Sequence, residues 1–339
     1  EISGGGGGYV AVDPSNPNVL FSEFTRLSIV RFSDGGATRN SFVDATGGIS
    51  DPNDAFPFIN PFLMDPNNPQ RLWTAGDRVW RTDNQGNNWT AASSQQFSDN
   101  NRASAYAVAP GNSNLVLIGR SDGSLLRNTN ATLANGATNW SEITLSNGYV
   151  SSLAFEPGNP LVVYATISSL NTDHLLRSAD AGLSWTAIDR RGQSNGIPDI
   201  PVHTIAIDPD NTQRLIVGTD LGIFVSTDGG STWAVENEGL APVIVENLAI
   251  NRIGGSKTLF ASLPDVDSKR LATTRFIRHV EQECLRKTFA ELSREVGVDD
   301  KTIRHIFDDY IERLQRDIPI ETPEVMGIDE LKIIGEYRA

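Results

Sequence analysis

Three acidic residues and one histidine in the first two thirds of the chain have the chemistry of a carbohydrate site. Asp51 and Asp54 lie in one predicted loop, and Asp199 lies in another beside His203. Hydrolysis of a glycosidic bond needs two carboxylates facing each other across a cleft, but spacing alone selects no pair here. These four residues are therefore candidates for a sugar site, with ordinary solvation of loops as the alternative. Other acids recur at regular intervals and are better explained as turn residues: Asp77, Asp122, Asp173 and Asp220.

A second group of residues has the pattern of a DNA-binding helix. Two helices separated by a three-residue turn at Gly297 are predicted between residues 289 and 306, because apolar residues recur there with a period near 3.6. This is the spacing of a helix-turn-helix, whose second helix enters the major groove of DNA. A plain helical hairpin is the alternative, and the acidic Asp308 and Asp309 oppose DNA binding. The side chains that would face DNA are Lys301, Thr302, Arg304 and His305.

The overall composition excludes several classes of protein. The 339 residues include 42 acidic and 28 basic side chains, and the net charge of −14 disfavours electrostatic binding of the whole chain to DNA or anionic lipid. A single cysteine excludes a disulfide framework, and no CxxC or HExxH spacing indicates zinc. No apolar run approaches the ~20 residues that cross a membrane, so no membrane partner is expected.

The chain changes composition after Leu263. Before this point lie 27 of the 30 glycines, all six tryptophans and a charge of −10, whereas the remainder holds the only cysteine, Cys284, and a charge of −4. Glycine, asparagine and tryptophan favour strands and turns, and the arginine-, glutamate- and leucine-rich remainder favours helices. We therefore predict a β domain over residues 1–263, a helical segment over 264–318 and the start of a further domain over 319–339.

The β domain is an internal repeat. A turn motif of Asp-Pro, or Glu-Pro in one copy, with asparagine two residues after the proline, begins at positions 13, 65, 156 and 208, with a weaker copy at 109. Each copy lies between two short apolar runs, so each repeat opens with a strand, a turn and a second strand. A second motif follows later in the repeat and combines an acid, a glycine and a tryptophan in a tight turn. It is clearest at Ser178-Ala-Asp180-Ala-Gly182-Leu-Ser184-Trp185 and Ser226-Thr-Asp228-Gly-Gly230-Ser-Thr232-Trp233.

Four strands in about 45 residues is the period of a β-propeller blade. Five repeats are visible, and a sixth begins at residues 243–250 and 258–262 but stops at Leu263, where a third strand would follow. Because a propeller closes on itself to protect its edges, we expect this one to be truncated.

The two motifs make residues 9–263 similar to the Asp-box (BNR) repeat propellers, which include sialidases, xyloglucanase-type glycoside hydrolases, and sortilin-like and photosystem-assembly-factor propellers. The resemblance implies an all-β propeller that binds a carbohydrate or protein ligand on the face formed by the loops with Asp51, Asp54 and Asp199. It also implies a structural role for the Asp boxes, which lie on the turn between the third and fourth strands. The residues concerned are Ser178, Asp180, Gly182, Trp185, Ser226, Asp228, Gly230 and Trp233.

Residues 269–339 resemble the insertion-sequence transposases of the ISL-three group, in which a helix-turn-helix precedes a Gly-Ile-Asp-Glu motif that opens an RNase H-like domain. Here the motif is Gly327-Ile328-Asp329-Glu330, on a first strand that turns back at Gly335. The resemblance implies that Asp329 is the first carboxylate of a DDE triad that binds Mg²⁺ in the full transposase. Two Mg²⁺ ions need a cluster of carboxylates, so we expect Asp329 to be idle in this chain and no cofactor to be required.

We interpret the chain as an incomplete propeller joined to the front of a transposase. An inserted element or a misassembled contig would produce such a join, whereas a natural two-domain regulator is a poorer explanation because both halves look incomplete. The expected function is a carbohydrate- or protein-binding scaffold fused to a fragment that binds transposon ends. The alternatives are an active propeller glycosidase and a DNA-binding fragment as the only function. The two resemblances imply different locations, export for the propeller and the cytoplasm for the transposase.

Overall fold

The structure is a computed structural model that describes residues 8–38, 41–49, 56–236, 243–253, 256–262, 266–267, 272–273, 277, 280–281, 283–296 and 300–317. The chain divides into two compact units, Glu1–Leu263 and Pro264–Ala339. The first unit is built of β-strands with one short 3₁₀ helix, η1 (Ala131–Leu133), and the second contains α-helices.

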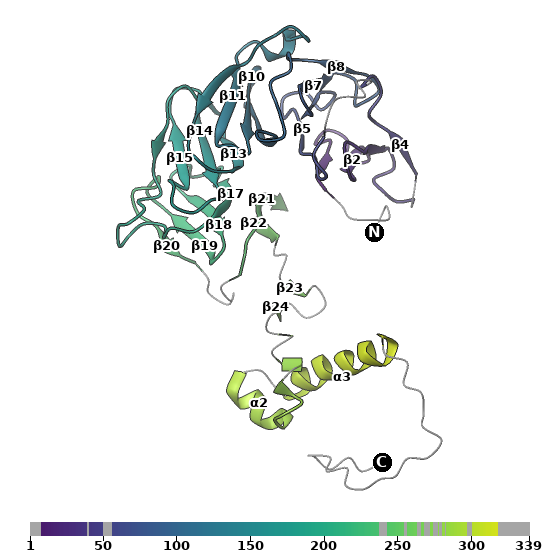
Figure 1. The fold of residues 1–339 in the computed structure, drawn as a ribbon, viewed down its shortest axis with the longest axis vertical. Coiled ribbons are helices and arrows are strands. Elements are labelled where there is room, and N and C mark those ends of the chain that lie inside the picture. Colours follow the sequence, from purple (N-terminus) through teal and green to yellow (C-terminus); the bar gives the residue numbers. More distant parts are fainter. Residues whose placement is uncertain are drawn as a thin grey trace. The chain divides into compact units, whose positions relative to one another are not determined.

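Five four-stranded antiparallel sheets, blades 1 to 5, follow one another along an arc in the first unit (Figure 1). In each blade the strands pair in chain order, so every blade is a meander. Blade 1 contains β1 (Val10–Val12), β2 (Leu20–Glu23), β3 (Ile29–Phe32) and β4 (Phe42–Asp44); blade 2 contains β5 (Phe62–Met64), β6 (Leu72–Ala75), β7 (Val79–Thr82) and β8 (Trp89–Ala91); blade 3 contains β9 (Ala103–Ala109), β10 (Asn112–Arg120), β11 (Ser124–Asn128) and β12 (Ser141–Thr144); blade 4 contains β13 (Val150–Glu156), β14 (Asn159–Ile167), β15 (Leu175–Ser178) and β16 (Thr186–Ala187); blade 5 contains β17 (Val202–Ile207), β18 (Leu215–Thr219), β19 (Gly222–Ser226) and β20 (Ala234–Val235).

A sixth sheet of two strands follows blade 5. It consists of β21 (Asn247–Ile253) paired antiparallel with β22 (Ser256–Ser262). The predicted propeller with five visible blades and a broken sixth is therefore confirmed.

The repeated Asp-Pro motif forms the turn between the first and second strands. In blade 1 the Oδ1 atom of Asp13 accepts hydrogen bonds from the backbone N–H of Ser15 at 2.8 Å and from its hydroxyl at 2.6 Å. The same atom of Asp208 accepts from the N–H of Asp210 at 2.9 Å in blade 5. Proline presets the backbone and the buried carboxylate holds the bend, which is why this motif marks the start of each repeat.

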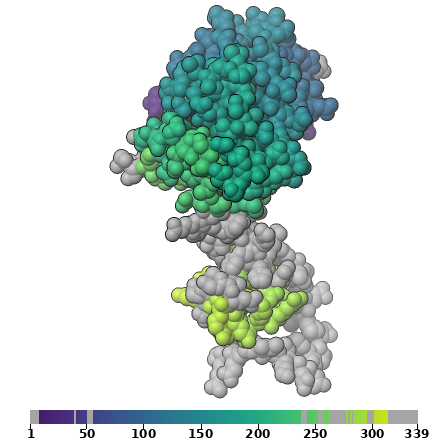
Figure 2. All heavy atoms as spheres, turned by 90° about the vertical axis from the view of Figure 1, so that its left-hand side faces the viewer, coloured from purple at the N-terminus to yellow at the C-terminus, as the bar shows by residue number. Residues whose placement is uncertain are grey.

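Neighbouring blades pack face to face through apolar side chains. One buried apolar cluster lies at each of the five junctions between successive sheets, for example Val162, Leu175 and Ile205 between blades 4 and 5. In the space-filling view, blades 4 and 5 form one continuous teal and green surface (Figure 2). Because both faces of a blade are covered, its middle strands are nearly continuous apolar runs instead of alternating ones.

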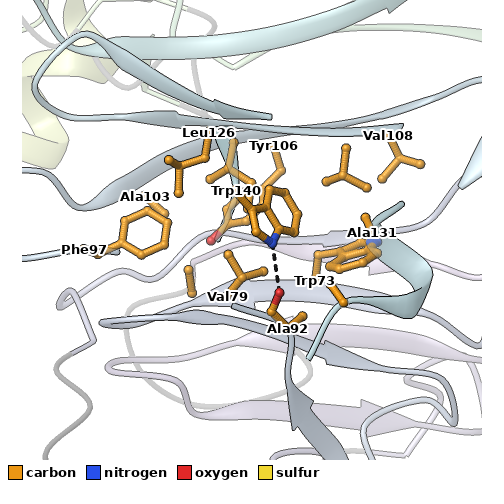
Figure 3. Packing of buried hydrophobic residues seen from close by; sticks show 14 residues of the cluster. Trp73, Val79, Ala92, Phe97, Ala103, Tyr106, Val108, Leu126, Ala131 and Trp140 are labelled. Carbon is orange, nitrogen blue, oxygen red and sulfur yellow. Dashed lines mark hydrogen bonds between the residues drawn. The ribbon is translucent and has the colours of Figure 1, made fainter. Parts of the chain in front are cut away.

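Tryptophans of the Asp-box turns also connect successive blades by hydrogen bonds. The indole N–H of Trp140 in blade 3 donates to the carbonyl of Ala92 in blade 2 at 2.8 Å, as Figure 3 shows. Trp89 binds Ala45 of blade 1 in the same way at 2.7 Å. The ring of Trp140 also meets Trp73 edge-on, with centroids 6.1 Å apart. The tryptophan of this motif therefore both fills the junction and satisfies a buried carbonyl.

The second unit contains a short strand pair and a helical core. Strands β23 (Val266–Asp267) and β24 (Ala272–Thr273) pair antiparallel, and helices α2 (Phe289–Val296) and α3 (Asp300–Asp317) follow. Within the predicted helical segment 264–318, these two short strands are not helical, and the described helical residues begin at Ile277. Buried apolar side chains from all three helical segments form one core: Ile277, Val280, Leu292, Ile303 and Ile306.

Helix α2 begins with a capping box that the sequence analysis did not identify. The Oε2 atom of Glu291 accepts hydrogen bonds from the backbone N–H and hydroxyl of Thr288, at 3.0 and 2.9 Å, and the hydroxyl accepts from the Glu291 N–H at 3.3 Å. These bonds satisfy N–H groups that a helix start leaves unpaired. Among the described helices, none is long and apolar enough to cross a membrane.

Candidate functional site

The candidate carbohydrate residue Asp199 lies in the loop from blade 4 to blade 5, where it is bonded to the β14–β15 loop. Its Oδ1 atom accepts a hydrogen bond from the N–H of Asn171 at 2.8 Å and lies 2.9 Å from Nε2 of His174. The N–H of Asn171, followed by the imidazole of His174, holds the pKa of Asp199 below its usual value. Asp199 is thus suited to accept hydrogen bonds as a carboxylate, and not to donate a proton as a general acid.

His174 is a residue of this site that sequence reasoning missed. Its side chain is fully buried, its backbone N–H donates to Oδ2 of Asp189 at 2.7 Å, and its ring Nδ1 atom has no hydrogen-bond partner among the described residues. The buried imidazole of His174, just before β15, therefore helps to fix the orientation of the Asp199 carboxylate. The sequence signal was weak, because one histidine in a loop carries no spacing that distinguishes it.

His203, the other candidate in this region, belongs to a different pair. Its Nε2 atom lies 2.7 Å from Oδ1 of Asp220, one of the acids attributed to turns. The structure therefore gives His203 and Asp199 separate partners instead of pairing them with each other. Asp51 and Asp54 lie outside the described residues.

A cavity of about 410 Å³ opens beside the loop that precedes Asp199. Its charged lining comes from Asp173, Asp189, Arg190 and Arg191, and its far wall is the Asp-box turn of blade 5. The Arg191 guanidinium lies 3.8 Å from a carboxylate oxygen of Asp173 and 4.0 Å from one of Asp199. The arrangement places a cation between two half-exposed carboxylates at the mouth of a polar cavity.

The Asp-box carboxylates are bonded within their own turns. Asp180 accepts from the Ser184 hydroxyl at 2.6 Å and from its N–H at 2.9 Å, and Ser178 donates to it at 2.7 Å. Asp228 makes the equivalent bonds with Thr232 and Ser226, at 2.7, 2.9 and 2.8 Å. The serine hydroxyls in turn accept from the N–H of Gly182 and of Gly230, each at 2.8 Å.

The two glycines of the Asp boxes have a left-handed backbone, with φ of 83° at Gly182 and 92° at Gly230, which favours glycine. The tryptophans differ: Trp233 donates to Ile188 of blade 4 at 2.8 Å, whereas Trp185 donates to Gly182 of its own turn at 3.1 Å. The Asp boxes are thus occupied by turn and junction contacts.

The predicted DNA-facing residues lie in the first two turns of α3. Lys301, Arg304 and His305 are exposed and Thr302 is half-buried, while Ile303 between them is buried in the helical core. The Arg304 guanidinium lies 4.9 Å from the centre of the Phe289 ring at the start of α2. This cation–π contact gives Arg304 a fixed direction relative to α2.

Asp329, the expected metal-binding carboxylate, lies outside the described residues, as does the whole segment 318–339. Within the part of the chain that the structure describes, no group of three or more His, Cys, Asp or Glu side chains could hold a metal ion.

The geometry defines the first unit as an arc of β-propeller blades and the pair α2–α3 as a helix-turn-helix. Residues 261–311 match the helix-turn-helix domain of transposase family ISL3. This confirms the resemblance predicted for the second part, although the match begins before residue 269 and ends before the Gly-Ile-Asp-Glu motif. No sequence match to a curated protein reaches significance.

Solved structures similar to this chain are β-propellers. An ancestral GH74 enzyme has a TM-score of 0.54 and 18% identity, over 70% of this chain and 32% of that one. The GH74 xyloglucanase from Xanthomonas campestris has a TM-score of 0.43 and 18% identity, over 79% of this chain and 54% of that one. YCF48 from Cyanidioschyzon merolae has a TM-score of 0.45 and 13% identity, over 76% of this chain and 93% of that one.

Of these three similarities, the one above a TM-score of 0.5 establishes the propeller fold and no activity. The chain spans about a third to about a half of the length of these two GH74 structures. The chain thus combines a propeller-fold region with a helix-turn-helix of transposase type.

Proposed function

We propose that the second unit binds double-stranded DNA through the N-terminal turns of α3. The observation that carries this proposal is the exposed basic group of Lys301, Arg304 and His305 within the segment that matches a transposase helix-turn-helix. In helix-turn-helix proteins the N-terminal residues of the second helix contact base edges in the major groove. The resemblance to ISL3 transposases makes transposon ends the proposed target.

The charge distribution along α3 supports contact by its first turns. The exposed side chains change from basic at Lys301, Arg304 and His305 to acidic at Asp308 and Glu312. Asp308 and Glu312 would be repelled by phosphates, so the helix would enter the groove with its N-terminal end. Arg304, directed by Phe289, is the residue proposed to bind a guanine edge with two hydrogen bonds.

The test is selection of a binding sequence from a library of random duplexes with the full chain. Binding of the selected duplex is then measured for Lys301→Ala and Arg304→Ala, with Arg286→Ala as the matched control. Arg286 belongs to the same unit and its side chain is 79% exposed. Arg304→Ala should weaken binding by about 1–3 kcal/mol and relax the preference at one base. Failure to enrich any sequence, or equal loss in all three variants, would contradict DNA readout by α3.

The propeller is proposed to be a carbohydrate-binding scaffold, and a specific observation favours this second function. The cavity beside Asp173 and Arg191 is polar and bordered by carboxylates that could accept hydrogen bonds from sugar hydroxyls. Sugar-array binding should be lost in Arg191→Ala and kept in Arg127→Ala, a control in blade 3. A protein ligand at the same loops is the alternative outcome. For the alternative of glycosidase action, the lowered pKa of Asp199 suits an ionised nucleophile or base and opposes the role of general acid, which needs a raised pKa.

The joined chain is proposed to be a binding protein without catalysis of its own. Strand transfer needs a cluster of carboxylates around two Mg²⁺ ions, and Asp329 is the one such carboxylate that the resemblance assigns here. A strand-transfer assay with Mg²⁺ and the selected duplex should show no product. Product that is lost in Asp329→Asn would overturn this part of the proposal.

A further inference from the structure

One loop beside the cavity carries two adjacent arginines. This segment, the 189–197 loop, follows β16 and contributes Arg190, Arg191 and Gln193 to the cavity lining. Arg190 is exposed, and the side chain of Arg191 is 37% exposed. Both guanidinium groups are therefore accessible to a molecule that enters the cavity.

The 189–197 loop is fixed by backbone hydrogen bonds. The N–H of Ile197 donates to the carbonyl of Asp189 at 2.8 Å and closes the loop at its base, where the Ile197 side chain is fully buried. The N–H of Trp233 in blade 5 donates to the carbonyl of Asn195, also at 2.8 Å. The loop is thus bonded to itself and to the neighbouring blade, so its backbone is organised before any ligand arrives.

Arg190 has a strained backbone within this loop. Its φ is 55°, in the left-handed region that residues other than glycine rarely adopt. The N–H of Gln193 donates to the Arg190 carbonyl at 3.0 Å and so maintains this turn. Strain of this kind is concentrated at ligand sites, where it gives a side chain a particular direction.

The two guanidinium groups have unused hydrogen-bond donors. Arg190 forms no ion pair or side-chain hydrogen bond with a described residue. Arg191 lies 3.8 Å from Asp173 and 4.0 Å from Asp199, which is beyond the range of a direct hydrogen bond. Other arginines of the propeller donate side-chain hydrogen bonds to described partners: Arg31, Arg71, Arg81, Arg102, Arg120 and Arg127.

The acids that line the cavity leave Arg190 without an acidic partner. Asp189 is 2% exposed, and its carboxylate oxygens accept hydrogen bonds from the backbone N–H groups of His174 at 2.7 Å and Arg191 at 3.4 Å. Asp173 is half-exposed and lies beside Arg191. An anionic group in the cavity would supply the missing negative charge, and its oxygens would match the forked donors of a guanidinium.

We propose that the cavity beside Arg190 and Arg191 binds the acidic group of a sugar, either the carboxylate of a uronic acid or a sulfate ester. This inference rests on the proposed carbohydrate function and narrows it to acidic saccharides. The two arginines bind the oxyanion, and Asp173 accepts hydrogen bonds from hydroxyl groups of the same sugar. A neutral sugar would leave the charge of Arg190 unpaired and would forgo the stronger, charge-assisted hydrogen bonds.

The experiment compares matched sugars for binding to the full chain. An array carries oligosaccharides of glucuronate, galacturonate and mannuronate, the methyl ester of each, the corresponding neutral sugars and their 6-O-sulfated forms. Methyl esterification keeps the rings and hydroxyl groups and removes the charge. Acidic members should bind at least about tenfold more tightly than esters and neutral sugars. The uronate and sulfate series show which oxyanion the cavity prefers.

Replacement of Arg190 tests where the oxyanion binds. Arg190→Gln should weaken binding of the preferred acidic sugar at least about tenfold and change binding of neutral sugars less than about twofold. Arg214→Gln is the matched control, because Arg214 is a 48% exposed arginine of blade 5 outside the cavity lining.

A preference for acidic sugars that Arg190→Gln abolishes and Arg214→Gln retains supports the proposal. Equal or tighter binding of esters and neutral sugars overturns it and leaves the carbohydrate function standing. A preference for acidic sugars that survives Arg190→Gln also overturns it, because the oxyanion would then bind elsewhere. If no sugar on the array binds, the proposed carbohydrate function fails and this inference fails with it.

Discussion

The indole N–H of Trp233 lies 2.8 Å from the carbonyl oxygen of Ile188, so the Asp-box turn of blade 5 is hydrogen-bonded to the end of the fourth strand of blade 4. Gly230 of the same turn packs on the Ile188 side chain, where a Cβ atom would approach to 2.8 Å. One residue of blade 4 is therefore held by two residues of a single motif. The repeat joins neighbouring blades through the motif that also shapes each turn.

Replacing Trp233 with phenylalanine tests this connection. Trp233→Phe keeps an aromatic ring in the junction but leaves the partly buried carbonyl of Ile188 without its donor. We expect a loss of about 0.5–1.5 kcal/mol in the free energy of unfolding, measured in urea. Trp185→Phe should cost less, because Trp185 is half-exposed and bonds within its own turn. Equal losses in both variants would show that ring packing, and not the bond between blades, matters.

The Asp boxes should make the propeller sensitive to acid. Hydrogen bonds lower the pKa of Asp228 to about 2. The largest contribution comes from the Thr232 hydroxyl, followed by the Thr232 N–H and the Ser226 hydroxyl. A carboxylate whose folded pKa is lowered stabilises the fold above its unfolded value of about 4, and this stabilisation is lost as the pH falls toward 2. Asp228→Asn should therefore reduce the dependence of unfolding free energy on pH between 4 and 2. An unchanged pH profile would assign acid unfolding to other groups.

Glu23 should have the opposite effect on stability. Its side chain is buried at the end of β2, and burial raises its pKa despite a hydrogen bond from the N–H of Asn60. A raised folded pKa means that stability falls as the pH rises from about 4.5 through that value. Glu23→Gln should therefore stabilise the protein at pH 7 and give no gain at pH 4. Glu246→Gln, at an exposed site, is the control, and equal behaviour of the two variants would contradict the prediction.

The sequence predicted the propeller because its signals are local. The side chains of Asp-Pro turns and Asp boxes form hydrogen bonds with residues only a few positions away, as Asp13 does with Ser15 and Asp180 with Ser184. Such motifs can be found without knowing which strands are neighbours. The helices α2 and α3 are likewise indicated by apolar spacing within a short stretch of the chain.

The candidate site was less predictable because its contacts join distant residues. Asp199 was selected as an acid outside the repeat, but its partner His174 is 25 residues away on another loop. His203 stood close to Asp199 in sequence, yet it binds Asp220. Asp173 recurs at an equivalent place in other repeats and was therefore attributed to a turn. The sequence does not show that it also lines the cavity and lies near Arg191.

The single cysteine should report on the helical unit. Burial against the core of the second unit raises the pKa of the Cys284 thiol to about 11. Since the thiolate is the reactive form, alkylation by iodoacetamide at pH 8 should be slow in native protein and fast in urea. Val280→Ala opens the same core and should speed alkylation without denaturant. A native rate equal to that of a free thiol would show that Cys284 is not packed as described.

Asp308, in the middle of α3, should weaken DNA binding, so its replacement should increase affinity. Asp308 is exposed one turn after Arg304 and would approach phosphates when the helix enters the groove. Asp308→Asn removes one repulsion and should strengthen binding of the selected duplex about two- to fivefold at low salt. The gain should shrink as salt is added, because screening weakens exposed charges. Glu142→Gln, an exposed acid of the propeller, should change nothing. A gain in both variants would mean that net charge, and not the face of α3, controls binding.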